Sequence, residues 1–172
     1  MVDLTADCSQ CAALCCVALA FDKGEMFAFD KPAGVACKHL KGPLCGIHAT
    51  LETEGLKGCV NYQCDGAGQR VVQEVFDGQS WQDSPELLPP MLEAFAQMRQ
   101  VHRHLVLLRA VESLPLSEAQ KTSILQFRER LSPLSGFNQN SLAALETSGI
   151  YKTISAFYKS LRDIVQATQE GA

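Results

Sequence analysis

The sequence predicts a mainly α-helical protein in which a small, irregular, cysteine-rich module packs on a C-terminal antiparallel helical bundle. Three observations lead to this fold class. All eight cysteines lie between Cys8 and Cys64. The stretch from Val35 to Asp65 has little periodicity and several glycines. From Pro90 onward, apolar residues recur at helical spacing. We place the module at residues 1–82 and the bundle at residues 83–172. The boundary falls in a polar, proline-containing connector, Gln79 to Pro90, which holds the single tryptophan, Trp81.

Composition narrows the class of protein. The chain has 172 residues, of which 47% are hydrophobic and 20% are charged, so it can bury a globular core. The net charge is −4 and no run is rich in Lys or Arg, which argues against a nucleic-acid partner. The apolar stretches are too short to span a bilayer, and the acidic N-terminus lacks the basic region of a secretory signal. We therefore expect a cytoplasmic protein with no membrane association and with reduced thiols.

The first element is predicted as one helix from Asp7 to Phe21, because this stretch is rich in Ala and Leu and has no Gly or Pro. Asp7 is the expected N-cap. Helical spacing would place Cys8, Cys11 and Cys15 on one face, with Cys16 about 100° away from Cys15. These thiols could share one metal ion or divide between two.

The rest of the module is predicted to be mostly loop. The alternation in Glu25–Asp30 predicts one short strand. Residues 35–65 are typical of a segment that is held by something other than a small apolar core. Gly66-Ala67-Gly68 is interpreted as a tight turn, because no strand precedes it in a dinucleotide-binding arrangement. A second helix should follow it, to about Phe76.

The C-terminal part is predicted to contain four helices, at residues 90–114, 117–131, 141–146 and 150–169. Pro115 ends the first of them. Ser117 and Gln120 have the spacing of a capping box, which marks the start of the second. The apolar stripes of these helices need partners, and the second helix of the module is a candidate.

The cysteines carry the strongest chemical signal. Thiolates are soft ligands that bind zinc or build an iron–sulfur cluster, and a tetrahedral zinc site uses four ligands. The spacing allows two four-cysteine zinc sites, one cluster with spare thiols, or one multi-metal centre. We expect one interlocked centre that draws ligands from both halves of the stretch. The predicted metal ligands are Cys8, Cys11, Cys15, Cys16, Cys37, Cys45, Cys59 and Cys64.

The cysteines also allow other interpretations. A four-disulfide secreted module is disfavoured, because no signal sequence is present and the cysteine-free remainder can form its own core. Buried free thiols that pack as small hydrophobic groups are the plain structural alternative. A thioredoxin-type redox pair at Cys8 and Cys11 would need a βαβ setting, and the sequence shows none. No Ser/His/Asp triad or pair of catalytic carboxylates can be defended, so the sequence leaves open whether the chain is an enzyme.

Three histidines are additional ligand candidates or could support the ligands by hydrogen bonding. His39 and His48 lie two and three residues after a cysteine, and for each of them we favour a hydrogen bond to the backbone over ligation. His102 lies on the apolar stripe of the long helix, where a buried core or interface histidine is the ordinary interpretation. The alternative is that His102 covers the metal module from below.

The cysteine pattern resembles a known family. The motifs are Cys8-x2-Cys11-x3-Cys15-Cys16, Cys37-x-His39, Cys45-x-Ile47-His48, Gly58-Cys59-x2-Tyr62-x-Cys64 and Gly66-Ala67-Gly68-Gln69. They resemble the bacterial YkgJ-type cysteine-cluster family (CxxCxxCC), described as zinc- or iron-chelating, and most closely its variant found ahead of pentapeptide repeats. The resemblance covers about residues 7–82. It implies metal chelation by the eight cysteines.

Two departures limit what the resemblance implies. Three residues precede the Cys15-Cys16 pair, where the broad family usually has two, and no pentapeptide repeats follow. A relative with a similar cluster, the flagellin lysine methylase, implies an iron–sulfur centre used in protein modification, but no S-adenosylmethionine site is recognisable here. The expected function is therefore zinc or iron–sulfur binding, with the helical bundle as a surface for a protein partner. The alternatives are an iron–sulfur enzyme and a store or chaperone for a thiophilic metal such as Cu(I).

Overall fold

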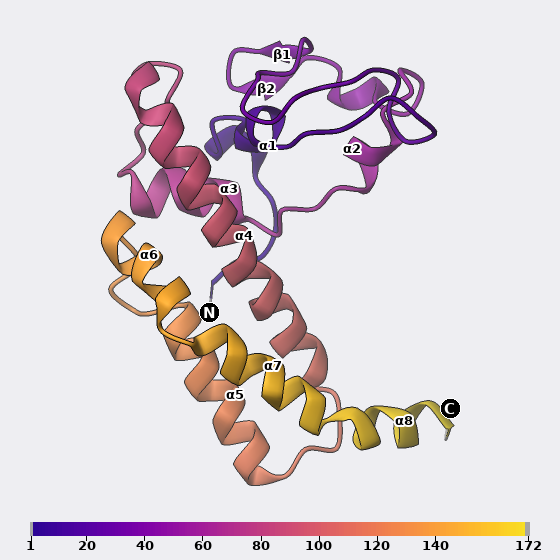
Figure 1. Cartoon of the computed structure of the whole chain (residues 1–172), viewed down its shortest axis with the longest axis vertical. Coiled ribbons are helices and arrows are strands. Elements are labelled where there is room, and N and C mark those ends of the chain that lie inside the picture. Colours follow the sequence, from indigo (N-terminus) through magenta and orange to yellow (C-terminus); the bar gives the residue numbers. More distant parts are fainter. Residues whose placement is uncertain (1, 171–172) are drawn as a thin grey trace.

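The computed structural model describes residues 2–170, and only the backbone of residues 168–170. Met1, Gly171 and Ala172, at the outer ends of the two predicted domains, lie outside the described residues. The structure is mainly helical, with a single two-stranded sheet in the described part, so the predicted fold class is confirmed. Figure 1 shows the loop-rich N-terminal part beside the upper half of a long helix and the C-terminal helices on the lower side of that helix.

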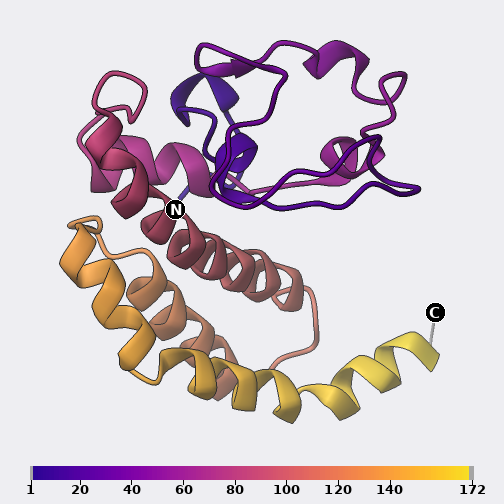
Figure 2. The same ribbon diagram turned by 45° about the horizontal axis from the view of Figure 1, so that its top comes forward.

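The long helix α4 (Leu88–Val111) is the axis of the molecule, and α5 (Glu118–Leu131) runs back antiparallel beside it (Figure 1). The chain then forms α6 (Gln139–Thr147), α7 (Ile150–Ser160) and α8 (Arg162–Glu170). In Figure 2 the helix α4 lies between the cysteine-rich loops on one side and α5 to α7 on the other. Across the described residues, no helix combines the length and the apolar character needed to cross a bilayer.

The helical predictions hold in this half, with two adjustments. The capping box is confirmed, because the Ser117 hydroxyl accepts from the Gln120 N–H and the Gln120 side chain accepts from the Ser117 N–H. A second capping box, between Asn138 and Ser141, starts α6 earlier than predicted. The single last helix of the prediction is wrong: α7 ends at Ser160 and α8 begins at Arg162. The break falls at Leu161, whose side chain is buried in the core.

The predicted continuous helix from Asp7 to Phe21 is also wrong. A 3-10 helix at Cys8–Gln10 is separated from α1 (Leu14–Ala18) by two left-handed residues, Ala12 and Ala13, with φ values of 47° and 54°. Alanine rarely adopts this conformation, because its Cβ crowds the following carbonyl. A distant contact holds it here: the Trp81 indole N–H donates to the Ala12 carbonyl at 2.7 Å. A tertiary hydrogen bond has therefore overridden the local helix preference.

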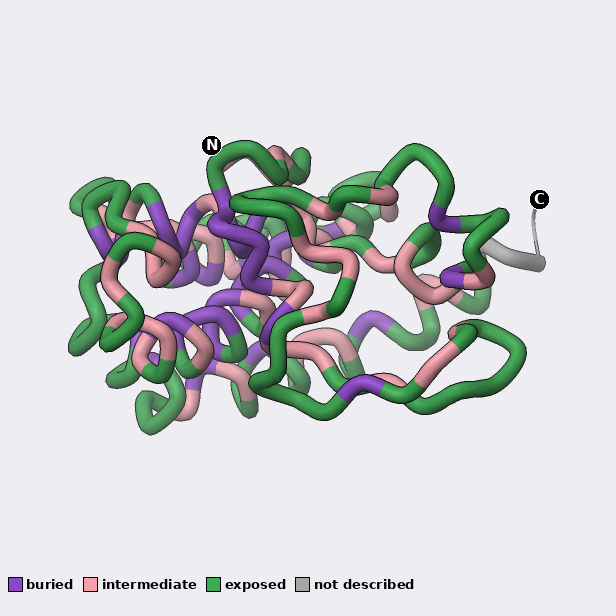
Figure 3. The backbone as a smooth tube through the Cα atoms, turned by 90° about the horizontal axis from the view of Figure 1, so that it is seen from above, coloured by how far each residue is buried: buried purple, intermediate pink, exposed green. Residues whose placement is uncertain are grey.

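The loop segment, residues 20–65, has little regular structure. The strand predicted at Glu25–Asp30 is wrong, because the chain pairs only through an isolated bridge between Phe21 and Lys31 and finds no neighbouring strand. The short elements are β1 (Leu40–Lys41) and β2 (Leu44–Cys45), which are antiparallel, a 3-10 helix at His48–Thr50, and α2 (Lys57–Asn61). The buried residues in the loop segment are Lys31, Leu51 and Leu56. Figure 3 accordingly shows long exposed or half-buried loops beside a buried helical part.

The predicted second helix of the module is confirmed as α3 (Ala67–Arg70), which continues into a π-helical turn at Val71–Val75. Gly66 precedes it with a φ of 82°, in agreement with the predicted tight turn. After a 3-10 helix at Pro85–Leu87, α4 packs against both α3 and α1. One apolar core therefore runs across the predicted module boundary and includes Leu14 and Val71 as well as residues of α4 to α7.

Candidate functional site

All eight cysteines are free thiols, which speaks against the disulfide alternative. Four of them line one small cavity of about 20 Å³ under the turn that follows the 3-10 helix, together with Gly68 and Phe95. A cavity of this size holds about one water molecule or one ion. The four thiols belong to Cys8, Cys11, Cys15 and Cys64, which we call the first thiol group.

The first thiol group comes from both ends of the cysteine-rich stretch, and local contacts explain how. The Asp7 carboxylate caps the 3-10 helix by accepting from the Ser9 N–H at 2.9 Å. The Gln69 side chain of α3 accepts from the Asp7 N–H, which fixes this turn against α3. A Cβ on Gly68 would lie 3.0 Å from the Cys11 Cβ, so only glycine lets α3 approach the Cys11 thiol this closely.

The remaining four cysteines are Cys16, on α1, and Cys37, Cys45 and Cys59, in the loop segment. The Cys37 N–H donates to the Cys16 carbonyl at 2.9 Å, and Cys45 lies on β2. Cys59 lies on α2, and its neighbours Cys37, Cys15 and Cys45 are close enough to raise its pKa further once burial has raised it. We call Cys16, Cys37, Cys45 and Cys59 the second thiol group. Because Cys15 acts electrostatically on members of both groups, the two are neighbours.

A buried cation lies beside the second thiol group. Lys31 is 5% exposed, and its ammonium donates to the carbonyls of Val17, Leu19 and Pro32 at 3.0, 2.5 and 3.1 Å. No carboxylate in the described part of the chain forms an ion pair with it. Burial lowers the pKa of Lys31, and the charges that oppose this shift are thiolates, led by Cys37 and Cys16. The three carbonyls satisfy its hydrogen bonds but provide no negative charge.

The enclosed surroundings favour the protonated thiol. Burial is the main cause that raises the pKa of Cys8, and it also raises the pKa of Cys11, to about 12. In both cases the charge of Cys15 makes the next largest contribution. For Cys15 the largest cause is a side-chain hydrogen bond with Cys16, followed by burial, and both raise its pKa. A ligand that binds these thiols as thiolates must therefore displace protons, so its affinity falls as the pH is lowered.

The thiols are chemically suited to a soft metal, but as they lie in this structure they are too far from one another to bind one ion together. Among the described residues, no three Cys, His, Asp or Glu side chains converge closely enough to hold one ion. The donor set is nevertheless one that zinc, iron or Cu(I) prefers, and four of the thiols share one cavity. Coordination would require the thiols to close by side-chain rotation and loop movement. Cys37, Cys45, Cys59 and Cys64 lie in the loop segment, which has few buried residues to hold it in place.

The three histidines lie in different surroundings. His39 is half-buried with its ring 5.6 Å from the Phe29 ring, and His48 is exposed on its 3-10 helix, so neither shows the side-chain hydrogen bond to backbone that we favoured. His102 is 1% exposed, with Nδ1 2.5 Å from the Asp65 carbonyl. Since a carbonyl only accepts, Nδ1 carries the proton and donates. His102 therefore positions the residue next to Cys64.

Sequence reasoning missed two residues of this site. Nothing in the sequence separates Lys31 from the exposed lysines around it, because its burial follows from the loop closing over α1. Trp81 was assigned to a connector, yet its indole fixes the left-handed turn between Cys11 and Leu14. A single tryptophan in a polar connector was the one available signal, since a large aromatic ring is seldom left in solvent.

Comparison with known proteins adds a relative of unknown activity. The chain is 33% identical over 166 residues to an uncharacterized protein, YybG of Bacillus subtilis (strain 168). The alignment covers 96% of this chain but 60% of YybG, so the chain spans about three fifths of the length of the curated relative it matches. The aligned part includes both the cysteine-rich stretch and the helical half. No family model matches the chain, and no solved structure matches it.

Proposed function

We propose that this chain binds a thiophilic metal, as zinc or as an iron–sulfur centre, through the thiolates of its two thiol groups. The proposal includes membership of the YkgJ-type cysteine-cluster family and a cytoplasmic location, where thiols stay reduced. Cys8, Cys11, Cys15 and Cys64 would hold metal in the first group, and Cys16, Cys37, Cys45 and Cys59 in the second. The bound metal would staple the loop segment, which has too few buried residues to be held by packing.

The observation that carries this proposal is the buried ammonium of Lys31. A cation removed from water costs free energy unless negative charge lies close to it. Among the ionisable groups of the described residues, those that favour the charged form of Lys31 most are the thiols of Cys37, Cys16, Cys15 and Cys59. A metal bound by four thiolates carries net negative charge, because the thiolates outnumber the positive charges of zinc. Lys31 is then the counter-ion of that complex.

Elemental analysis and a visible spectrum of anaerobically purified protein test the proposal. A zinc centre gives a colourless protein with stoichiometric zinc, and an iron–sulfur centre gives a brown protein with broad absorption near about 400 nm. A store for Cu(I) would instead take up more than two equivalents per chain and exchange them readily. Protein that contains no metal and does not bind added zinc, iron or Cu(I) in competition with a chelator would overturn the proposal.

Lys31→Met sharpens the test. Loss of the buried positive charge should weaken zinc affinity, measured by competition with a colorimetric chelator, by about tenfold or more. The matched control is Lys23→Met, an exposed lysine of the same loop, which should leave the affinity unchanged. Lys31→Arg keeps the charge and should retain most of the affinity if it is accommodated. Equal affinity in Lys31→Met and the wild type would remove Lys31 as the counter-ion.

A further inference from the structure

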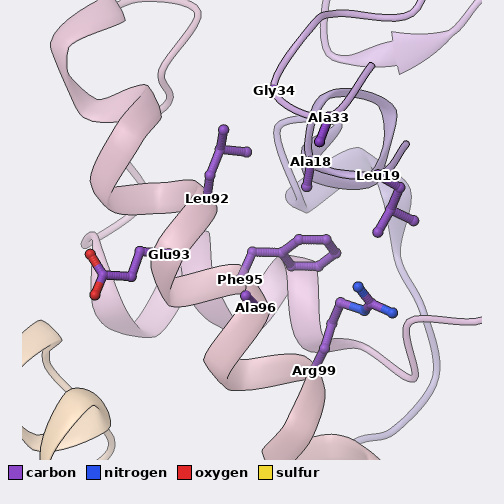
Figure 4. Close-up of a pocket in the computed structure, with 9 residues that line it drawn as sticks. All are labelled: Ala18, Leu19, Ala33, Gly34, Leu92, Glu93, Phe95, Ala96 and Arg99. Atoms are coloured by element: carbon purple, nitrogen blue, oxygen red, sulfur yellow. The ribbon is translucent and has the colours of Figure 1, made fainter. Parts of the chain in front are cut away.

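A second cavity, of about 440 Å³, lies between the first half of α4 and two short stretches of chain (Figure 4). These are residues 18–19, at the end of α1, and residues 33–34, in the loop segment. This volume falls in the range of small-molecule sites. Its lining is mainly apolar, and Phe95 belongs both to this cavity and to the one that holds the first thiol group. The two cavities therefore share a wall. The lining residues used below are Leu19, Leu92, Glu93, Phe95 and Arg99.

Arg99 is the cation of this cavity. Its guanidinium lies 5.5 Å from the centre of the Tyr62 ring and 5.8 Å from that of Phe95, so two aromatic rings hold it in place. Within the described residues it forms no ion pair and no side-chain hydrogen bond. Arg70 and Arg128, by contrast, each pair with a glutamate. The planar donor edge of Arg99 is thus positioned without a protein acceptor.

The walls define what else a ligand needs. Figure 4 shows the Arg99 guanidinium below Leu19 and beside the Phe95 ring, with Leu92 nearer the start of α4. The Glu93 side chain points the other way, away from Phe95 and Arg99. A ligand that reaches Arg99 therefore meets one positive charge and an otherwise apolar surface. Glu93 at the rim and the single cation disfavour a doubly charged phosphate.

We propose that this cavity binds a small organic monocarboxylate with a short branched apolar chain, whose carboxylate pairs with Arg99 and whose chain packs against Leu19, Leu92 and Phe95. A guanidinium and a carboxylate match in a two-bond, planar arrangement that an ammonium does not provide. The aromatic contacts of Arg99 reduce the entropy lost on binding, because the side chain is already ordered. Such a ligand would bind next to the first thiol group without using a thiol.

Calorimetric titration with matched pairs of probes tests this site. The probes are 3-methylbutanoate and its amide, and N-acetyl-leucine and its amide. Each pair differs in the negative charge that Arg99 would recognise. Both acids should bind saturably, and their amides about tenfold or more weakly. Binding of 3-methylbutanoate identifies a free acid as sufficient, whereas binding of N-acetyl-leucine alone identifies the carboxyl end of a peptide as the source of the same chemistry.

Variants locate the binding at Arg99. Arg99→Met should weaken acid binding to the level of the amides, and Arg103→Met, an exposed arginine one turn further along α4, should not change it. Circular dichroism and the fluorescence of Trp81 report whether each variant is folded. Equal binding of acid and amide by the wild-type chain, or unchanged acid binding in folded Arg99→Met, overturns the proposal. Because no thiol takes part, acid binding is measured on the metal-free chain and zinc binding on the chain without acid, so this site and the metal proposal fail separately.

Discussion

Nine residues of α4 are buried, whereas the much longer loop segment, residues 20–65, has three, and one of these is the charged Lys31. The helical half is held by an apolar core, with Phe95, Met98 and Leu108 at 1% exposure or less. The loop segment is held by turns, by the hydrogen bonds of Lys31 and by stacked rings such as Phe21 on Phe27, whose centroids are 4.2 Å apart. Most of the second thiol group lies in this weakly held segment.

This difference in packing indicates which region of the molecule a bound ligand can stabilise or rearrange. A packed core resists rearrangement, because its side chains already interdigitate. A segment with few buried groups opens and closes at low cost in free energy, and anything that binds it contributes directly to its stability. The first thiol group lies at the border, beside Gly68 of α3 and against Phe95, which joins the two regions.

The largest effect is expected for Phe95→Ala. This side chain is 1% exposed and lines both cavities, so its removal should lower the free energy of unfolding by about 3–5 kcal/mol. Urea unfolding followed by circular dichroism measures it. Leu125→Ala, at a side chain that is 63% exposed on α5, is the control and should change the value by less than about 0.5 kcal/mol. Similar values for the two variants would mean that the helical half is not held by this core.

The pH dependence of the free energy of unfolding tests the contact of His102 with the Asp65 carbonyl, where α4 meets the end of the loop segment. Burial lowers the pKa of His102 to about 4, against 6.5 for an exposed histidine. The unfolded chain therefore binds this proton at higher pH than the folded one. The part of the free energy of unfolding that depends on a neutral His102 is fully present above pH 6.5. It is lost as the pH falls toward 4, by about 3 kcal/mol in total. His102→Gln should remove this part of the slope.

The measurement for His102 is urea unfolding of wild type and variant at a series of pH values between 4 and 7. His48→Gln, at an exposed histidine, serves as the control and should follow the wild-type curve. If His102→Gln has the same pH dependence as the wild type, the surroundings of His102 do not hold it neutral in the folded chain.

Metal should act on the loop segment more than on the helices. At a free zinc concentration about a hundred times the dissociation constant, the free energy of unfolding should rise by about 2.7 kcal/mol. Hydrogen exchange should slow between residues 20 and 65 and stay unchanged in α5. A uniform effect on both regions, or none, would contradict a metal that staples the loops. Replacing Cys37 by serine should reduce the protection, and replacing Ser123 of α5 by alanine should not.

The smallest effect is expected at a helix cap in the half that already has a core. Ser117→Ala removes the side chain that accepts from the Gln120 N–H, at a cost of about 1 kcal/mol. Thermal unfolding measures the loss, and Ser123→Ala within the same helix is the control. Because α5 is packed on α4, the helix should stay folded and the loop segment should not respond. A larger loss, or altered thiol reactivity, would show that the two regions are more tightly coupled than the structure indicates.

The sequence predicted best where local signals and packing agree. The helices α4 and α5 carry periodic apolar residues, a stop at Pro115 and the Ser117 capping box, and each of these signals acts within one turn of its element. The prediction failed at residues 7–21. There the hydrogen bond between Trp81 and Ala12, which lie 69 residues apart, holds a turn that interrupts the helix favoured by local propensity. The prediction failed at residues 25–30 because an alternating stretch needs a neighbouring strand, and none is present in the described part of the chain.

The candidate site divides in the same way. The sequence by itself determined that eight thiols are concentrated before residue 65 and that the chain after them can form its own helices, because composition and periodicity are properties of the chain alone. Only the tertiary structure decided that Cys64 joins Cys8, Cys11 and Cys15 at one cavity, and that Lys31 and Arg99 are cations with no carboxylate partner among the described residues. Proximity and burial depend on how distant segments meet, and that is set by the packing of α3 and α4 beneath the loops.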